Sequence, residues 1–231
     1  MRLEIALAAL ALSFAQSAIA QDNAASVVPV EKAPFHVPVF KNEYVTMLNV
    51  YIPAGRTAGY HKHSIDYVFV FVEPAKTKAQ VLGEQPVDRN IPAGTVNYAN
   101  YTKKPLIHQV SNVDSHPFRV VGFEIMYPEA GRFTPSERSE ATGYKQVLDN
   151  ERVRGWRLVL EPGASVPTIT QKAPGIRIVL TGGDIAESGP EQPGQDMNLK
   201  LGDFIWQEPG TTRAVRNTGT TRVDLFEFEL K

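Results

Sequence analysis

The feature of this sequence that most constrains its fold is an internal repeat. Residues Phe40 to Val45 read FKNEYV, and residues Leu148 to Val153, which lie 108 positions later, read LDNERV. The same offset continues without a gap through the following strand-like segments. After a three-residue deletion it places Asn112 opposite Asn217. A constant offset over many positions predicts two copies of one structural unit.

Each copy is predicted to consist of short β-strands. Runs of β-branched and aromatic residues are bounded by Pro, Gly, Asn or Asp, which is typical of strands separated by turns. In Tyr67 to Val72, aromatic residues alternate with valine, so both faces of this strand are apolar, as in a sandwich or a small barrel. The expected strands are 45–52, 67–72 and 118–126 in the first copy and 153–160, 176–180 and 222–230 in the second.

The composition excludes several classes of protein. The 231 residues contain 24 Lys and Arg, 25 Asp and Glu, and no Cys. A formal net charge of -1 argues against nucleic-acid binding through a broadly basic surface. The lack of Cys excludes disulfides, thiolate metal sites and Cys nucleophiles.

The N-terminus has the features of an export signal. Arg2 is followed by an apolar run from Ile5 to Phe14, and Ala18 and Ala20 are small residues at the positions that a signal peptidase reads. We therefore expect residues 1–20 to be a signal peptide, followed by a loose lead-in at 21–39. The mature protein is expected in the periplasm or outside the cell, with no membrane contact after cleavage.

Four residues of the first copy could hold a metal ion. His61 and His63 are two positions apart, so on a strand their imidazoles would face the same side. A neighbouring strand could supply His108, and a hairpin could return Asp66 to the same point. Three neutral imidazoles and one carboxylate suit one divalent transition metal, which could be Fe, Mn, Zn, Ni or Cu.

These residues occur in a pattern that resembles the cupin superfamily. One cupin motif contains Gly, five residues and then His-x-His, as in Gly55, His61 and His63. The other contains Pro-x-Gly, His and, four positions later, Asn; it is matched in type by a set of four residues, Pro92, Gly94, His108 and Asn112. The resemblance implies an all-β chain with two tandem cupin barrels of the double-stranded β-helix (jelly-roll) type. The expected domains are a metal-binding cupin at 40–130, a linker at 131–147 and a degenerate cupin at 148–231. The resemblance also implies a homodimer as one possible assembly.

The chain departs from the cupin pattern at two places. The family's Glu is absent at its usual distance, and Asp66 stands one or two positions early, so a site of three histidines completed by water is the alternative to an Asp66 ligand. Thirteen residues separate Gly94 from His108 where the motif has two. This insertion, which includes Tyr98 and Tyr101, is predicted to form a flap or a pocket wall.

The second copy has no comparable ligands. Ile169, Gln171, Pro174 and Arg213 stand opposite His61, His63, Asp66 and His108. No transition-metal site is expected there. We expect this half to stabilise the first or to make the dimer contact, and the alternative is an anion site formed by Arg213 with Trp206 as a wall. Outside the pattern, His116 is predicted to be solvated and His36 to be inert.

Two functions fit these residues. The first is an exported metalloenzyme that acts on a small organic molecule by dioxygenase, isomerase or lyase chemistry, with Tyr67 and Tyr98 as the only nearby acid–base candidates. The second is a non-catalytic periplasmic cupin that binds a small ligand or a metal. The sequence identifies neither the catalytic residues nor the substrate.

Overall fold

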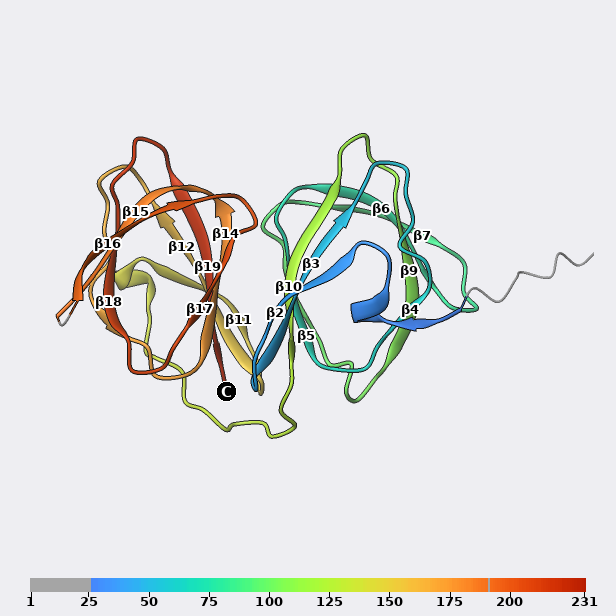
Figure 1. The fold of residues 1–231 in the computed structure, drawn as a ribbon, viewed down its shortest axis with the longest axis horizontal. Coiled ribbons are helices and arrows are strands. Elements are labelled where there is room, and N and C mark those ends of the chain that lie inside the picture. The colour runs from blue at the N-terminus through green and yellow to red at the C-terminus, as the bar shows by residue number, and fades with distance from the viewer. Residues whose placement is uncertain (1–25, 191) are drawn as a thin grey trace, which may run out of the picture.

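The computed structural model describes residues 26–190 and 192–231, so the predicted signal peptide lies outside the described residues. Within the described part, no helix is long and apolar enough to cross a membrane. The chain is all-β, as predicted, and forms two barrels (Figure 1). We call strands β1 to β10 the first barrel and strands β11 to β19 the second barrel.

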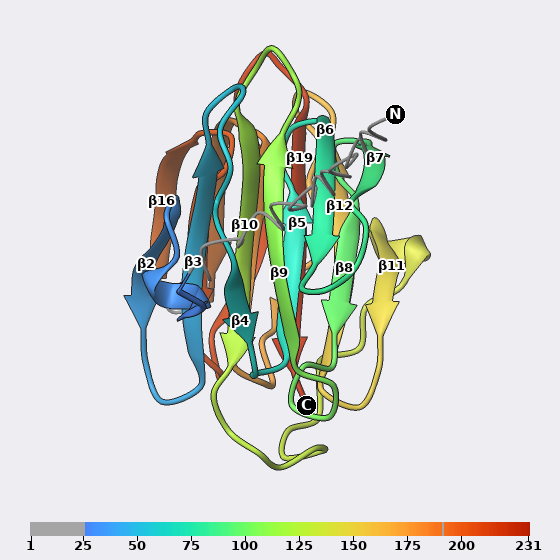
Figure 2. The same ribbon diagram turned by 90° about the vertical axis from the view of Figure 1, so that its right-hand side faces the viewer.

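The first barrel consists of two five-stranded sheets. The inner sheet, which faces the second barrel, has the order β2-β3-β10-β5-β8, and the outer sheet has the order β1-β4-β9-β6-β7. Figure 2 looks onto the outer sheet. The strands are β1 (Val28–Pro29), β2 (His36–Lys41), β3 (Val45–Ile52), β4 (His61–His63), β5 (Tyr67–Phe71), β6 (Ala75–Val81), β7 (Val87–Ile91), β8 (Val96–Ala99), β9 (Leu106–Asn112) and β10 (Phe118–Ile125).

The second barrel repeats this arrangement. Its inner sheet has the order β11-β12-β19-β14-β17, and its outer sheet has the order β13-β18-β15-β16. The strands are β11 (Tyr144–Asp149), β12 (Val153–Leu160), β13 (Ile169–Thr170), β14 (Gly175–Thr181), β15 (Gly183–Gly189), β16 (Gln192–Leu199), β17 (Phe204–Gln207), β18 (Thr212–Asn217) and β19 (Val223–Leu230).

The strand registers agree with the sequence repeat. Val45 pairs with Ile125 in the first barrel, and Val153 pairs with Leu230 in the second. Asn112 and Asn217 also make equivalent hydrogen bonds. The side-chain amide of Asn112 donates to the carbonyls of Ile52, at the end of β3, and His116, in the turn after β9. The amide of Asn217 donates to the carbonyls of Leu160, at the end of β12, and Thr221, in the turn after β18. These two asparagines therefore fix the same turn in both barrels.

The two inner sheets pack against each other, so strands of both are covered on both faces (Figure 1). Strand β10 is buried at seven of its eight positions, which explains why its sequence is almost continuously apolar. Phe123 of β10 meets Phe228 of β19 edge to face, with ring centres 5.6 Å apart. Apolar residues of both barrels thus form one continuous core between the sheets, which includes Met47, Val68, Val70, Ile176, Ile178 and Phe226.

The lead-in is not the loose segment that the prolines suggested. Residues Val28–Pro29 form β1, which pairs in parallel with β4, and a 3-10 turn at Val30–Lys32 leads to β2 at the edge of the inner sheet. Pro38 is tolerated because β2 is an edge strand with a register shift beside this residue. The segment before residue 40 is therefore part of the first barrel.

The segment between the barrels is likewise partly structured. Residues Glu140–Thr142 form one 3-10 turn that ends at Gly143, whose φ of 86° lies in the left-handed region. Strand β11 begins at Tyr144. The C-terminal part of the predicted linker therefore belongs to the second barrel.

Candidate metal centre

Strand β4 directs two histidines into the first barrel. His61 and His63 are buried, with 0% and 4% of their surface exposed, whereas Lys62 between them is exposed. This alternation is the geometry of a strand whose one face lines the barrel interior. The imidazoles have ring centres 5.0 Å apart.

The third histidine comes from the strand next to β4. His108 of β9 pairs directly with His61 across the sheet, and their ring centres are 4.6 Å apart. The Nε2 atom of His63 lies 3.1 Å from the Nε2 atom of His108. One nitrogen from each of the three residues lies within 4.8 Å of the other two, so the structure brings the three predicted histidines together.

Hydrogen bonding fixes the tautomer of His61. Its Nδ1 lies 2.9 Å from the carbonyl oxygen of Gly59, and only a protonated Nδ1 can donate to that acceptor. The Nε2 of the neutral ring therefore carries a lone pair, and this buried atom has no hydrogen-bond partner among the described residues. A backbone carbonyl that holds Nδ1 in this way is the usual support for a histidine that binds a metal through Nε2.

The three imidazoles are held in the neutral form that metal binding requires. Burial is the main cause, and the neighbouring histidines a second cause, of a pKa lowered to about 2 for His63 and to about 3 for His108. Burial also lowers the pKa of His61, although its hydrogen bond to Gly59 acts in the opposite direction. All three rings therefore present lone pairs at neutral pH.

The cluster fits a divalent transition metal. Two nitrogens bonded to one cation at about 2.0–2.1 Å lie roughly 2.8–3.4 Å apart when the angle between the bonds is about 90–109°. The separation of 3.1 Å between the His63 and His108 nitrogens is in this range. Three protein ligands leave one or more coordination positions for water or a substrate. No other group of three metal-ligating side chains of this kind occurs in the part of the chain that the structure describes.

The histidines lie on the wall of a cavity of about 320 Å³ inside the first barrel. Its remaining wall is largely apolar and includes Phe69, Phe71, Phe118, Val50, Ile52 and Val120. The predicted insertion contributes Tyr101, whose ring stacks on His63 at 4.8 Å, and this confirms that the insertion forms a pocket wall. The cavity is large enough for a small organic molecule next to the histidines.

Tyr67 also lines the cavity, with its ring centre 5.6 Å from that of His63. Its hydroxyl is buried and has no hydrogen-bond partner among the described residues. Burial is the main reason that the pKa of this phenol is raised well above its usual range, and the nearby Glu124 raises it further. Tyr67 is therefore a neutral proton donor in this structure.

Asp66 does not join the histidine cluster, which corrects the prediction that it is the fourth ligand. Its Oδ2 accepts a hydrogen bond of 2.8 Å from the hydroxyl of Tyr98, and its Oδ1 accepts one of 3.0 Å from the backbone N–H of Thr102. Arg152, which precedes β12 of the second barrel, lies 3.5 Å from Oδ2. The carboxylate therefore anchors the insertion and links the barrels, and the three-histidine alternative is the one that the geometry supports.

Tyr98 has the same structural role. Its hydroxyl donates to Asp66, and it is not among the residues that line the cavity. Burial first and then the bond to Asp66 raise the pKa of Tyr98 above its usual range. The prediction that Tyr98 could act as an acid or base at the site is not supported by this position.

His36 was predicted to be inert, but it lies on the cavity wall. Its ring centre is 4.5 Å from that of His61, and its Nδ1 lies 3.0 Å from the carbonyl oxygen of Pro34. No motif pointed to this position, because His36 precedes both cupin motifs in the chain. His116 lies apart from the cluster, partly exposed, with its Nε2 3.3 Å from Asp114.

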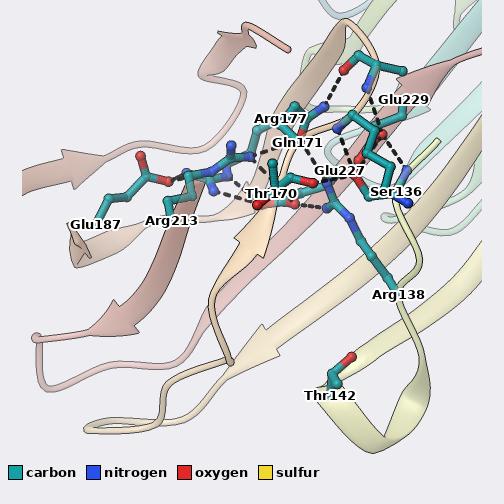
Figure 3. A network of polar contacts seen from close by, with 12 residues as sticks. Ser136, Arg138, Thr142, Thr170, Gln171, Arg177, Glu187, Arg213, Glu227 and Glu229 are labelled. Carbon is teal, nitrogen blue, oxygen red and sulfur yellow. Dashed lines mark hydrogen bonds and ion pairs between the residues drawn. The ribbon is translucent and has the colours of Figure 1, made fainter. Parts of the chain in front are cut away.

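The corresponding region of the second barrel contains ion pairs instead of a metal site (Figure 3). Ile169 pairs with Arg213 just as His61 pairs with His108. Arg177 donates to Glu227 at 2.7 Å, and Arg138, from the segment between the barrels, contacts both Glu227 and Glu229. Further members of this network are Gln171, Ser136, Glu187 and Arg213.

The network leaves no free arginine for an anion. Arg213 lies 3.3 Å from Glu187 and 3.4 Å from the side-chain oxygen of Gln171. Trp206 lies between the barrels, where it stacks on Tyr44 with ring centres 6.0 Å apart. The alternative of an anion site with Arg213 and Trp206 is therefore wrong for this structure.

Comparison with known proteins gives similarity in structure but not in sequence. No known protein family pattern matches the chain, and no curated protein is similar to it. AerE from Microcystis aeruginosa is 12% identical over 86% of this chain and 98% of its own, with a TM-score of 0.61. A salicylate 1,2-dioxygenase from Pseudaminobacter salicylatoxidans is 16% identical over 81% of this chain and 71% of its own, with a TM-score of 0.54.

A cupin domain from Bordetella pertussis also matches, with 23% identity over 38% of this chain and 91% of its own and a TM-score of 0.36. At these identities the likeness concerns the fold alone. Together with the two barrels and their repeated registers, it shows that the chain has the cupin fold.

Proposed function

We propose that this chain, whose two barrels have the cupin fold, binds one divalent transition metal through His61, His63 and His108 and acts on a small organic molecule in the adjoining cavity. The observation that carries the proposal is the convergence of three neutral imidazoles on the wall of a cavity of about 320 Å³. Of the ions expected from the sequence, Fe, Zn, Ni and Cu suit imidazole ligands, whereas Mn favours carboxylate and water oxygens.

The residues around the histidines have different roles in binding a substrate. A bound metal would supply a Lewis acid with at least one position open to the substrate. Tyr67 and Tyr101 flank His63 and confine the molecule on that side. The phenylalanines opposite exclude water from the apolar part of the cavity, which strengthens polar interactions near the histidines. The ring of Tyr67 forms part of the wall, whereas its hydroxyl is buried beside Gly122 of β10.

The metal site is tested by comparing two histidine substitutions in the purified full-length protein. His63→Ala should remove the metal, measured by mass spectrometry of the elements, because it deletes one of three ligands. His116→Ala should leave the metal content unchanged, because His116 lies outside the cluster. Equal metal retention in both variants would contradict the proposal.

The type of reaction is tested next. One structural neighbour is a dioxygenase by name, so oxygen uptake is the first activity to measure. Protein reconstituted with iron would be assayed with phenols, thiols and keto acids, and the products would be identified by mass spectrometry. Isomerase or lyase chemistry would transform a substrate without consuming oxygen. Tight binding with no turnover would favour the alternative of a ligand-binding cupin.

We further propose that the protein is exported and that the mature chain begins at Gln21. The apolar run at Ile5 to Phe14 and the small residues Ala18 and Ala20 support this proposal. The intact mass of the protein recovered from the periplasm or the medium of a bacterial host tests it. Recovery of only the uncleaved chain from the cytoplasm would contradict it.

A further inference from the structure

One arginine faces the cavity of the first barrel. Arg89 of β7 lines the cavity, and it pairs across the sheet with Thr77 of β6, which is buried and lines the same cavity. The neighbours of Arg89 in sequence, Asp88 and Asn90, are not lining residues. Because successive side chains of a strand point to opposite faces, the side chain of Arg89 is on the cavity side of the sheet.

The guanidinium of Arg89 has no acidic partner within the described residues. The ion pair on this hairpin is formed instead on the opposite face, where Lys78 lies 3.7 Å from Asp88. Glu84 is the only carboxylate among the described residues that line the cavity, and it lies in the exposed turn between β6 and β7. Arg89 is exposed as well, and no ion pair joins the two residues, so the guanidinium remains free to bind a ligand at the open side of the cavity.

The hairpin that carries Arg89 adjoins the strand that carries His108. Strand β7 pairs with β6, and β6 pairs with β9, where Val81 lies opposite His108. A positive charge at the mouth, three neutral imidazoles and an apolar wall define the complementary ligand. That ligand has an anionic group and an apolar or aromatic body.

We propose that the cavity takes a small carboxylate with an apolar or aromatic body, and that Arg89 positions its carboxylate. This inference rests on the proposed function only in placing the rest of the molecule near the histidines. A guanidinium donates two parallel N–H bonds to a carboxylate, which fixes orientation as well as affinity. Arg89 is thus a positioning and specificity-determining residue.

A matched pair of probes tests the charge preference. 3-Phenylpropanoate and 3-phenylpropanamide have the same ring and chain length and differ only in the charge of the terminal group. Their dissociation constants for the full-length protein would be measured by calorimetry, both in metal-free and in zinc-loaded form. The carboxylate should bind roughly 10-fold or more tightly than the amide in both forms, which is the size expected for a hydrogen-bonded charge pair.

Substitutions on one hairpin separate the role of Arg89 from that of bulk charge. Arg89→Gln should weaken binding of the carboxylate roughly 10-fold and leave binding of the amide nearly unchanged, and Arg89→Lys should recover part of the loss. Lys78→Gln removes the same charge from the opposite face and should change neither constant. Unchanged carboxylate binding in Arg89→Gln, an equal loss in Lys78→Gln, or no binding of either probe by the unaltered protein would overturn the proposal.

The metal-free measurements distinguish this inference from the proposed function. If His63→Ala and His116→Ala retained the same amount of metal, the proposed metal site would fail. The dependence of carboxylate binding on Arg89 in metal-free protein would still stand. Conversely, a metal centre without any effect of Arg89 would retain the proposed function and remove this inference.

Discussion

Burial controls the protonation of a carboxyl group in the first barrel as it controls that of the histidines. Glu124 of β10 has only 5% of its surface exposed. The pKa of Glu124 is raised to about 7, mainly by burial and also by the negative charge of Glu31, while Lys41 partly opposes the shift. A negative charge on this carboxyl would in turn raise the pKa of the buried Tyr67 hydroxyl. The folded protein therefore favours the protonated form of Glu124.

This shift predicts a pH dependence of stability. The folded-state pKa lies above the unfolded value, so the folded protein binds more protons than the unfolded chain between about pH 4.5 and 7. The contribution of Glu124 to stability is present at low pH and is lost as the pH rises through 7. Glu124→Gln should therefore stabilise the protein by roughly 1–2 kcal/mol at pH 8 and by much less at pH 5.

Urea unfolding of both proteins at the two pH values, in the presence of a chelator, measures this difference. The chelator removes metal release as a second source of pH dependence. The histidines titrate in both proteins alike, so only the change in the effect of the substitution is attributed to Glu124. An equal effect at pH 5 and pH 8 would show that the carboxyl has an ordinary pKa.

At the scale of elements, the insertion between Gly94 and His108 is held by Asp66, which was predicted to be a metal ligand. Asp66 accepts hydrogen bonds from Tyr98 and Thr102 of the insertion, and Tyr101 between them stacks on His63. The position of the pocket wall therefore depends on the Asp66 carboxylate. Its interaction with Arg152 also connects this wall to the second barrel.

Asp66→Asn should keep the metal and lose stability. The substitution preserves shape and an acceptor for Thr102, but it removes the charge that faces Arg152. We expect a loss of about 1–3 kcal/mol in the free energy of unfolding, measured by chemical denaturation. The metal content should equal that of the unaltered protein. A loss of metal as large as in His63→Ala would restore Asp66 as a ligand and contradict the three-histidine site.

The same elements show what the sequence could and could not predict. The expected strands 45–52 and 153–160 coincide with β3 and β12, because runs of β-branched residues between turns determine them locally. The alternation of His61 and His63 likewise predicted one face of β4. The prediction of a loose lead-in was wrong, because the strands of this segment are short and form only by pairing with β3 and β4.

The role of Asp66 could not be predicted for a related reason. Spacing from His61 and His63 placed it near the site, but its partners come from the insertion and from the other barrel. The position of His36 on the cavity wall also depends on pairing between distant segments. Long-range contacts of single side chains leave no periodic pattern in a sequence.

At the scale of the whole molecule, the two barrels share one apolar core. Residues of β3, β5 and β10 pack directly on residues of β14 and β19, so neither inner sheet keeps its burial without the other (Figure 1). The second barrel lacks the histidine cluster, and its interior contains an apolar core together with the network of arginines and glutamates (Figure 3). Its structural contribution is therefore to cover and support the barrel that holds the histidines.

The substitution Arg138→Met in the second barrel tests whether that barrel stabilises the first. Arg138 lies over the rings of Tyr144 and Trp156 and contacts Glu227 and Glu229, so its removal leaves buried carboxylates with too few partners. We expect a loss of roughly 3 kcal/mol in the free energy of unfolding. Arg154→Met is the matched control, because Arg154 forms a partly exposed pair with Asp149 and should cost less than about 1 kcal/mol.

Two probes show whether the destabilisation reaches the first barrel. Trp156 is buried in the core of the second barrel and Trp206 lies between the barrels, so their fluorescence follows the second barrel and its contact with the first during heating. Release of bound zinc to a colorimetric chelator follows the histidine cluster of the first. Because the inner sheets share a core, both signals should change together and shift to lower temperature by the same amount in Arg138→Met. Zinc release that stayed at the original temperature while the fluorescence transition moved would mean that the barrels unfold independently.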